Sequence, residues 1–265
     1  MQFEQRFGGT QRLYGKQATT AFAKAHVAVI GIGGVGSWVA EALARTAIGQ
    51  ITLIDLDDIC VTNTNRQIHA MHSTVGQDKT EAMAARIALI NPDCQVNCIE
   101  DFVTPDNVAS HLSVSQGFDY VIDATDSISA KIAIILHCKR HKIPLITIGG
   151  AGGQKDPTQI QVADLTKTIQ DPLAAKLRNR LRQQHGFSKN PARKFGIDCV
   201  FSTEQLTYPA ADGETCSSKA GLSGSTKLDC NSGFGAAVVV TATFGFVAVA
   251  RVLDKLQRRA SAQPG

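Results

Sequence analysis

Short apolar runs alternate with longer stretches whose apolar residues recur at helical spacing through the first 150 residues. The short runs predict strands and the longer stretches predict helices. Strands are expected at 27–31, 50–55, 95–100, 119–124 and 144–149, and helices at 34–47, 78–90, 104–112 and 127–141. This alternation predicts an α/β fold with a parallel sheet that helices cover on both faces.

The pattern changes after the glycine-rich stretch at 149–153. Strands are expected at 159–164 and near Cys199, and a basic helix at 171–184, so the C-terminal part should extend the sheet as a mixed sheet. Residues 209–232 are rich in Gly, Ser and Asp, which predicts a mobile loop. We divide the chain into an N-terminal arm with a short helix (1–25), a nucleotide-binding domain (26–165) and an extension completing the same fold (166–265).

The segment 232–250 carries no charged residue and is near the minimum length of a membrane-spanning helix. Its three glycines and two threonines make it only moderately apolar, and a helix that is apolar all round is equally typical of a protein core. We favour a long, buried closing helix. Membrane association through this segment stays a minority alternative.

Composition is that of an ordinary globular protein: 265 residues, 43% hydrophobic and 19% charged. A net charge of +4 permits an anionic partner but does not demand one. The seven cysteines are scattered and odd in number, which does not indicate a disulfide framework. Because the first 17 residues are polar and charged, we expect no secretory signal and a cytoplasmic protein.

A glycine loop follows the first predicted strand and contains Gly31, Gly33, Gly34 and Gly36. Glycines let the backbone approach a phosphate closely, and the next helix presents free N–H groups at its N-terminus. Asp55 ends the second predicted strand, where a carboxylate can accept ribose hydroxyl groups. Together these features predict a Rossmann-like nucleotide site.

Further polar residues should converge on this site, because ligands of parallel sheets bind beyond the carboxyl ends of the strands. Arg66 and Lys79 offer cations for phosphate oxygens, and Asp126 could hold Mg²⁺. The remaining candidates for nucleotide contact are Asp57, Asn63, Asn65 and Gln67.

The set resembles the ubiquitin-activating-enzyme-like superfamily, which includes ThiF and MoeB. The matching segments are 31–36, 63–67, 76–79 and 123–126, together with Asp55. The resemblance implies ATP-dependent adenylation of a carboxylate, with adenosine packed on Gly33, ribose held by Asp55 and Mg²⁺ bound by Asp126. It also implies that Arg66, Lys79 and Arg12 contact the triphosphate, Arg12 coming from the neighbouring subunit of a homodimer.

Many relatives carry two CxxC pairs that bind zinc, and this chain has no CxxC, so no zinc is expected. Segments 6–15, 33–38, 176–194 and 230–235 instead resemble the tRNA threonylcarbamoyladenosine dehydratases. That resemblance implies adenylation of the threonyl carboxylate of threonylcarbamoyladenosine in tRNA, followed by loss of water to give the cyclic form. A monovalent cation, and a link to the cysteine desulfurase CsdA and its sulfur acceptor CsdE, stay open.

A basic stretch supplies candidate contacts for tRNA phosphates, although charge runs are commonly solvated helix faces. Its members are Arg178, Arg180, Arg182, Lys189, Arg193 and Lys194. Cys230 is either an acyl or sulfur acceptor or an inert cysteine.

Three other functions remain as alternatives. The first is an adenylating activator of a small sulfur-carrier protein, of the ThiF/MoeB type, against which the missing zinc cysteines count. The second is an NAD-dependent oxidoreductase, against which the 63–67 motif and Lys79 count. The third is a scaffold that passes sulfur between partners without catalysis.

Overall fold

Seven strands form one sheet in the computed structural model, which describes residues 2–210, 213–217 and 234–262. The strand order is β3-β2-β1-β4-β5-β7-β6, and all neighbouring pairs are parallel except β6 and β7. The predicted parallel sheet with a mixed C-terminal extension is therefore confirmed. The strands are β1 (His26–Ile30), β2 (Gln50–Ile54), β3 (Gln95–Ile99), β4 (Tyr120–Asp123), β5 (Leu145–Ile148), β6 (Ile160–Asp164) and β7 (Asp198–Ser202).

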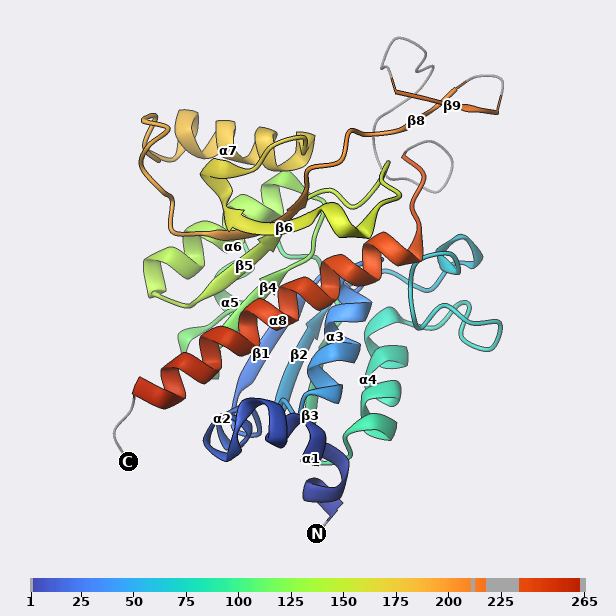
Figure 1. Cartoon of the computed structure of the whole chain (residues 1–265), viewed down its shortest axis with the longest axis vertical. Coiled ribbons are helices and arrows are strands. Elements are labelled where there is room, and N and C mark those ends of the chain that lie inside the picture. The colour runs from blue at the N-terminus through green and yellow to red at the C-terminus, as the bar shows by residue number, and fades with distance from the viewer. Residues whose placement is uncertain (1, 211–212, 218–233, 263–265) are drawn as a thin grey trace.

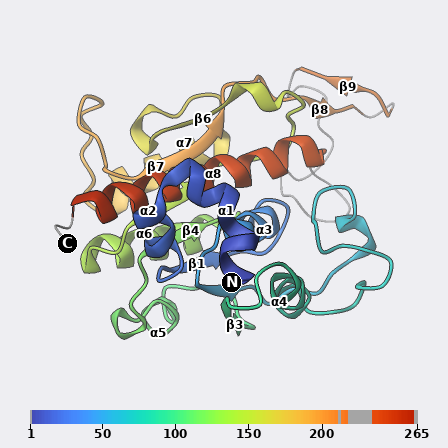
Figure 2. The ribbon, with the colours of Figure 1, turned by 60° about the horizontal axis from the view of Figure 1, so that its bottom comes forward.

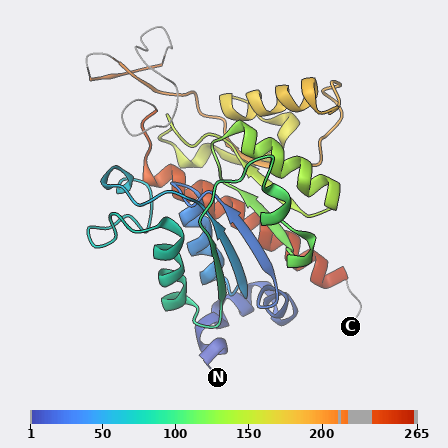
Figure 3. The same cartoon turned by 180° about the vertical axis from the view of Figure 1, so that it is seen from behind.

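The sheet separates two hydrophobic cores because successive side chains of a strand point to opposite faces. In β1, Val27 and Val29 join one core, and Ala28 and Ile30 join the other. Helices α2 (Lys16–Phe22), α3 (Gly36–Arg45), α4 (Lys79–Ile90) and α8 (Val238–Ala262) contribute to the first core (Figure 1). Helices α5 (Val108–His111), α6 (Ile128–His141) and α7 (Pro172–Gln184) contribute to the second (Figure 3).

Helix α8 differs from the predicted closing helix. It begins at Val238, six residues later than expected, and continues through the basic residues to Ala262. Only one side of the helix is buried: Val240, Phe244 and Ala248 pack against α3 and the sheet, whereas Phe246 is 45% exposed. Among the described residues, no helix is both long and apolar enough to cross a membrane.

The N-terminal arm is almost entirely helical, in contrast to the predicted arm with one short helix. Helix α1 (Gln2–Tyr14) precedes α2, and both lie at the end of the sheet where the parallel strands begin (Figure 2). The short strands β8 (Tyr208–Pro209) and β9 (Thr215–Cys216) pair within the stretch predicted as a loop. Most of that stretch lies outside the described residues, as does Cys230.

The predicted helix at 104–112 is wrong except for its last part, where α5 is formed. Asn107 explains the late start, since its side chain accepts a hydrogen bond from the backbone N–H of Thr104 at 2.7 Å. Asn side chains that bond to nearby backbone in this way stabilise turns rather than helices. Short 3₁₀ turns at Val61–Asn63, Val114–Gln116, Pro157–Gln159 and Leu165–Lys167 complete the described elements.

Candidate nucleotide-binding site

A pocket of about 550 Å³ lies at the carboxyl ends of the parallel strands. Its lining residues come from within segments 30–35, 54–57, 101–105, 124–130 and 148–152, which end or follow β1 to β5, together with Arg66, Gln67, Lys79, Leu173, Ala236 and Thr241. The volume is within the range of roughly 300–1,000 Å³ that is usual for ligand sites. The sheet therefore brings most of the predicted nucleotide residues together.

The glycine loop lines the pocket through Gly31, Gly33 and Gly34. Gly31 has a φ of +84°, a left-handed conformation that favours glycine. Gly36 is placed differently: it lies beneath the loop, where an added Cβ would overlap the carbonyl oxygen of Gly31. Gly36 therefore permits α3 to pack closely against the loop, and it is not among the residues that line the pocket.

Asp55 faces the pocket from the end of β2, as the sequence predicts. Its Oδ2 accepts a hydrogen bond from the backbone N–H of Ile32 in the glycine loop, and its Oδ1 accepts one from Asp57. Burial raises the pKa of the Asp55 carboxyl above its usual value, whereas the nearby Lys79 ammonium group opposes this effect. Each carboxylate oxygen has two lone pairs, so both can still accept a ribose hydroxyl.

Lys79 is buried at the start of α4 and lies between two carboxylates. Its Nζ is 2.7 Å from Oδ2 of Asp57 and 3.8 Å from Oδ1 of Asp55. Asp57 is about half exposed and also lines the pocket. The ammonium group thus has a fixed position at the pocket edge, suited to an anionic ligand.

Arg66 and Gln67 reach the pocket from the segment after β2. The Trp38 indole N–H donates to the carbonyl of Arg66 at 2.9 Å, and the Arg66 guanidinium donates to Thr62 and Asn65. Gln67 is 5% exposed, and its Oε1 has no hydrogen-bond partner. A buried acceptor without a partner next to the pocket fits a site that a polar ligand completes.

Asn63 and Asn65 do not line the pocket. The Oδ1 of Asn63 accepts a hydrogen bond from the backbone N–H of Cys60, and the amide of Asn65 donates to Ala236 at the approach to α8. Both residues therefore hold the loop that carries Arg66 in place.

Asp126 is an exposed lining residue after β4. The described residues contain no group of three or more His, Cys, Asp or Glu side chains able to hold a metal ion. Mg²⁺ usually takes one or two protein carboxylates and completes its coordination with phosphate oxygens and water. The exposed carboxylate of Asp126 at the pocket edge could supply one such ligand.

A buried charge network beneath the pocket was not predicted from the sequence. The Lys131 ammonium is 3.1 Å from Oδ2 of Asp123, with both side chains fully buried. Asp123 also accepts hydrogen bonds from the backbone N–H and the hydroxyl of Thr125, a lining residue. The network therefore holds the turn that presents Asp126.

Segments 101–105 and 149–152 also form pocket walls that the sequence analysis did not assign. In the sequence, only their position could have indicated a role in the site, because each segment directly follows a predicted strand. Phe102 contributes a 52% exposed ring, and the backbone N–H of Gly150 is held by the buried carboxylate of Asp171 at 2.9 Å.

Arg12 and the basic stretch lie apart from the pocket. Arg12 is in the last turn of α1, at the opposite end of the sheet (Figure 1). In α7, Arg178 donates to the carbonyls of Leu165 and Thr168, and Arg182 lies over the Phe195 ring at 5.5 Å. Four other members are exposed, namely Arg180, Lys189, Arg193 and Lys194.

Comparison with known protein families relates this architecture to one of them. The family described as "ThiF family" matches residues 9–263, which is nearly the whole chain. The chain belongs to the ThiF family. Asp55, Lys79 and Asp126 thus lie in one pocket of a ThiF-family protein.

Individual relatives match over nearly the full length. The chain is 63% identical to tRNA threonylcarbamoyladenosine dehydratase of Escherichia coli strain K12, covering 98% of this chain and 97% of the relative. It is 58% identical to the Haemophilus influenzae dehydratase, covering 98% and 96%. A crystal structure of the Escherichia coli dehydratase TcdA in complex with ATP superposes with a TM-score of 0.87, at 59% identity and coverage of 98% and 97%.

Proposed function

We propose that this protein is an ATP-dependent tRNA threonylcarbamoyladenosine dehydratase. One observation carries the proposal: a pocket holding Asp55, Lys79 and Asp126 occurs in a chain 63% identical, over 98% of its length, to a dehydratase of that name. The reaction adenylates the threonyl carboxylate and then eliminates water to close a ring.

The reaction needs activation because a carboxylate is a poor electrophile at neutral pH. Joining it to AMP, with release of pyrophosphate, creates a good leaving group. A nucleophile in the same modified nucleoside then attacks the activated carbonyl carbon and AMP leaves, so the ring closes intramolecularly at a high effective concentration. No protein thiol has to carry the acyl group.

The protein's residues bind and orient the reactants. Asp55 holds the ribose, while Arg66 and the fixed ammonium group of Lys79 bind the phosphates and stabilise the charge that develops at the α-phosphorus. Asp126 is the residue that would hold Mg²⁺, which supplies charge neutralisation on the phosphate oxygens when bound.

A homodimer completes this proposal. Arg12 lies away from the pocket of its own chain, so it would serve the pocket of a partner copy. Exposed apolar side chains support such association: Leu13 beside it is 77% exposed, and Val239 and Phe246 on α8 are 52% and 45% exposed.

The exposed cations Arg180, Lys189, Arg193 and Lys194 would contact tRNA phosphates. A monovalent cation and a link to CsdA and CsdE stay predictions.

Mass spectrometry of nucleosides tests the function directly. Purified protein is incubated with ATP, Mg²⁺ and tRNA containing threonylcarbamoyladenosine, and the tRNA is then digested. We expect an ATP-dependent product that has lost one water. An Asp126→Asn variant should need a higher Mg²⁺ concentration for the same rate, whereas Asp93→Asn, a control outside the pocket, should not.

Absence of the dehydrated product under conditions in which the Escherichia coli enzyme is active would overturn the proposal. Pyrophosphate exchange stimulated by a small carrier protein instead of tRNA would then identify an activator of sulfur carriers.

A further inference from the structure

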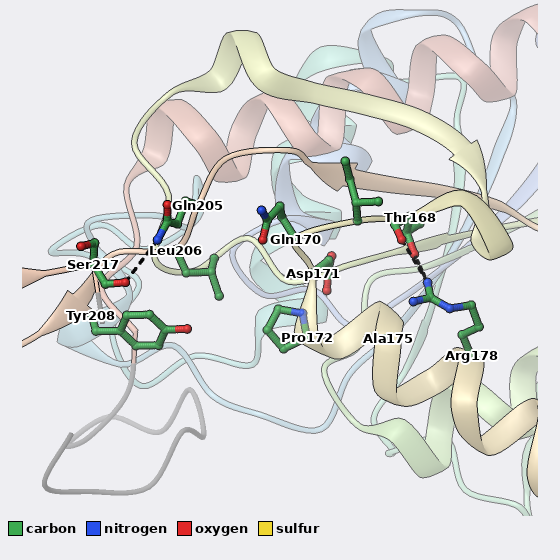
Figure 4. A pocket seen from close by; sticks show the side chains of 11 residues that line it. Thr168, Gln170, Asp171, Pro172, Ala175, Arg178, Gln205, Leu206, Tyr208 and Ser217 are labelled. Carbon is green, nitrogen blue, oxygen red and sulfur yellow. Dashed lines mark hydrogen bonds between the residues drawn. The ribbon is translucent and has the colours of Figure 1, made fainter. Parts of the chain in front are cut away.

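A second pocket, of about 500 Å³, lies beside the start of α7. Figure 4 shows Leu206 and Tyr208 on one side, and Pro172 and Arg178 on the side of α7. Its volume is close to that of the nucleotide pocket, about 550 Å³. None of its residues belongs to the set predicted to bind the nucleotide, although Arg178 was predicted to contact tRNA.

The two pockets share one partition, the glycine-rich segment 149–153. On one side of the second pocket, Asp171 accepts a hydrogen bond from the backbone N–H of Gly150, a residue that lines the nucleotide pocket. On the other side, the backbone N–H of Thr207 donates to the carbonyl of Gly153 at 2.7 Å. The second pocket is therefore connected to the nucleotide pocket through this segment.

The second pocket is held in shape by internal bonds. Asp171 also accepts a hydrogen bond from Ala174 and so caps α7, while Arg178 on the next turn donates to the carbonyls of Leu165 and Thr168. These contacts fix the edge formed by Ile169 and Gln170. Gln170 has a φ of +55°, a backbone conformation that is retained only where the surroundings determine it.

The lining favours a neutral, flat ligand over a phosphate. Arg178 is the one cation among the described lining residues, and its Nη1 already donates to the carbonyl oxygens of Leu165 and Thr168. The buried Asp171 carboxylate would repel an anion. Amide groups of Gln170 and Gln205 can bond to the edge of a base, and Ile169, which is 57% exposed, offers an apolar surface for its face.

We propose that this pocket receives the base of a nucleotide adjacent to the modified adenosine, while the modified adenosine itself reacts at the nucleotide pocket. This inference rests on the proposed function. Proteins recognise single-stranded RNA by splaying bases into such pockets, where they stack on side chains and are hydrogen-bonded along their edges. The pocket thus positions the tRNA independently of its phosphate contacts.

The test narrows the pocket with Ala175→Phe, a substitution on the half-buried side of α7 that lines it. Three tRNAs containing threonylcarbamoyladenosine are assembled by ligation: one intact, one abasic on the 5′ side of the modified nucleotide and one abasic on its 3′ side. Dehydration is measured against tRNA and ATP concentration. Ala88→Phe, at an exposed position of α4, is the matched control.

We expect Ala175→Phe to raise KM for intact tRNA on the order of tenfold, near the low end of what stacking of one base on an aromatic side chain contributes to binding. KM for ATP should not change. One of the abasic tRNAs should raise KM for the wild-type protein similarly, and Ala175→Phe should add nothing further with that tRNA. Ile169→Ala, at an exposed position, should raise KM for tRNA in the same direction without any risk to folding.

An unchanged KM for tRNA in both variants would overturn the inference. Effects of Ala175→Phe that are equal with intact and with both abasic tRNAs would also overturn it, as would a rise in KM for ATP alone. Failure of the wild-type protein to dehydrate intact tRNA would instead overturn the proposed function.

Discussion

Lys79 shows how one side chain serves both the fold and the site. Its ammonium group is buried beside Asp55 and Asp57, so one positive charge is shared by two carboxylates of the pocket. A buried charge is expensive unless it is paired, and the Lys79 ammonium group opposes the rise that burial causes in the pKa of the Asp55 carboxyl. The residue that we propose to bind phosphate therefore also stabilises the charge of the proposed ribose acceptor.

We expect Lys79→Ala to reduce the rate of adenylation by about 10²–10³-fold, through loss of charge stabilisation at the phosphates. The variant should also unfold at a lower temperature, because Asp55 loses its buried partner. Pyrophosphate exchange, measured at a temperature where circular dichroism shows the variant folded, separates the two effects. Lys24→Ala, at an exposed lysine, is the control, and normal exchange in Lys79→Ala would contradict the assignment.

His69 predicts a pH dependence of stability. Its Nε2–H donates to the carbonyl of Ile32 in the glycine loop, its Nδ1 is buried without a partner, and burial lowers its pKa from 6.5 to about 4. The folded protein therefore binds fewer protons than the unfolded chain between these values. The contribution of His69 to stability is present above pH 6.5 and is lost as the pH falls towards 4.

The loss amounts to about 3 kcal/mol at most, at roughly 1.4 kcal/mol per pKa unit. It is measured as the difference in free energy of unfolding between pH 7 and pH 4. His69→Gln should show a smaller difference than the wild-type protein, whereas His185→Gln, at an exposed histidine, should match it. Equal pH dependence of His69→Gln and wild type would refute the assignment.

At the scale of elements, the pattern of apolar residues predicts the position of a strand or helix where that pattern, rather than a single side chain, sets its ends. The parallel strands β1 to β5 lie within one or two residues of their predicted bounds, because each is a short apolar run, and all of them except the edge strand β3 are buried on both faces. Helix α5 was misplaced since a side chain of Asn107, rather than apolar spacing, sets its start. The partial exposure of α8 was also missed, because its exposed face carries apolar residues such as Phe246.

The residues of the candidate site also divide into those that the sequence could predict and those that it could not. Residues at strand ends with chemical character, such as Asp55 and Asp126, could be predicted, since topology alone brings them together. Lys131 could not, because a lysine in a helix usually faces solvent and only tertiary packing buries it against Asp123. The walls at 101–105 and 149–152 consist mostly of apolar residues and glycines, which carry little chemical signal in a sequence.

The junction between the glycine loop and α3 gives a prediction for an element. In Gly36→Ala the new methyl group would overlap the Gly31 carbonyl, so helix and loop must separate. We expect a loss of stability of about 1–3 kcal/mol and a higher KM for ATP. Gly9→Ala in α1 meets no atom within 4 Å and should be neutral or stabilising by up to about 1 kcal/mol. Thermal unfolding measures the melting temperatures of the two variants. Equal melting temperatures would contradict this role of Gly36.

At the scale of the whole molecule, the two ends of the sheet have separate tasks. The carboxyl end holds the nucleotide pocket, whereas α1, with Arg12 and the exposed Leu13, lies at the opposite end (Figure 1). Arg12 therefore lies away from the pocket of its own chain. The symmetric dimer that we propose would bring α1 of one copy to the pocket of the other.

Mixing two inactive variants tests the shared site. Arg12→Ala removes the residue supplied to the partner, and Lys79→Ala removes a residue of the chain's own pocket. In a mixed dimer, one pocket lacks both residues and the other has both, so equal mixing should restore about a quarter of the wild-type activity by statistical pairing. Dehydration of modified tRNA is measured after the variants have exchanged subunits, and each variant mixed with itself is the control.

If the mixture stays as inactive as the separate variants, although subunit exchange is demonstrated by a mass tag, Arg12 does not act across the dimer. A variant Arg6→Ala, also in α1 but bonded to the carbonyl of Ile90 in its own chain, should keep most of its activity alone, which separates loss of the shared arginine from general damage to the helix.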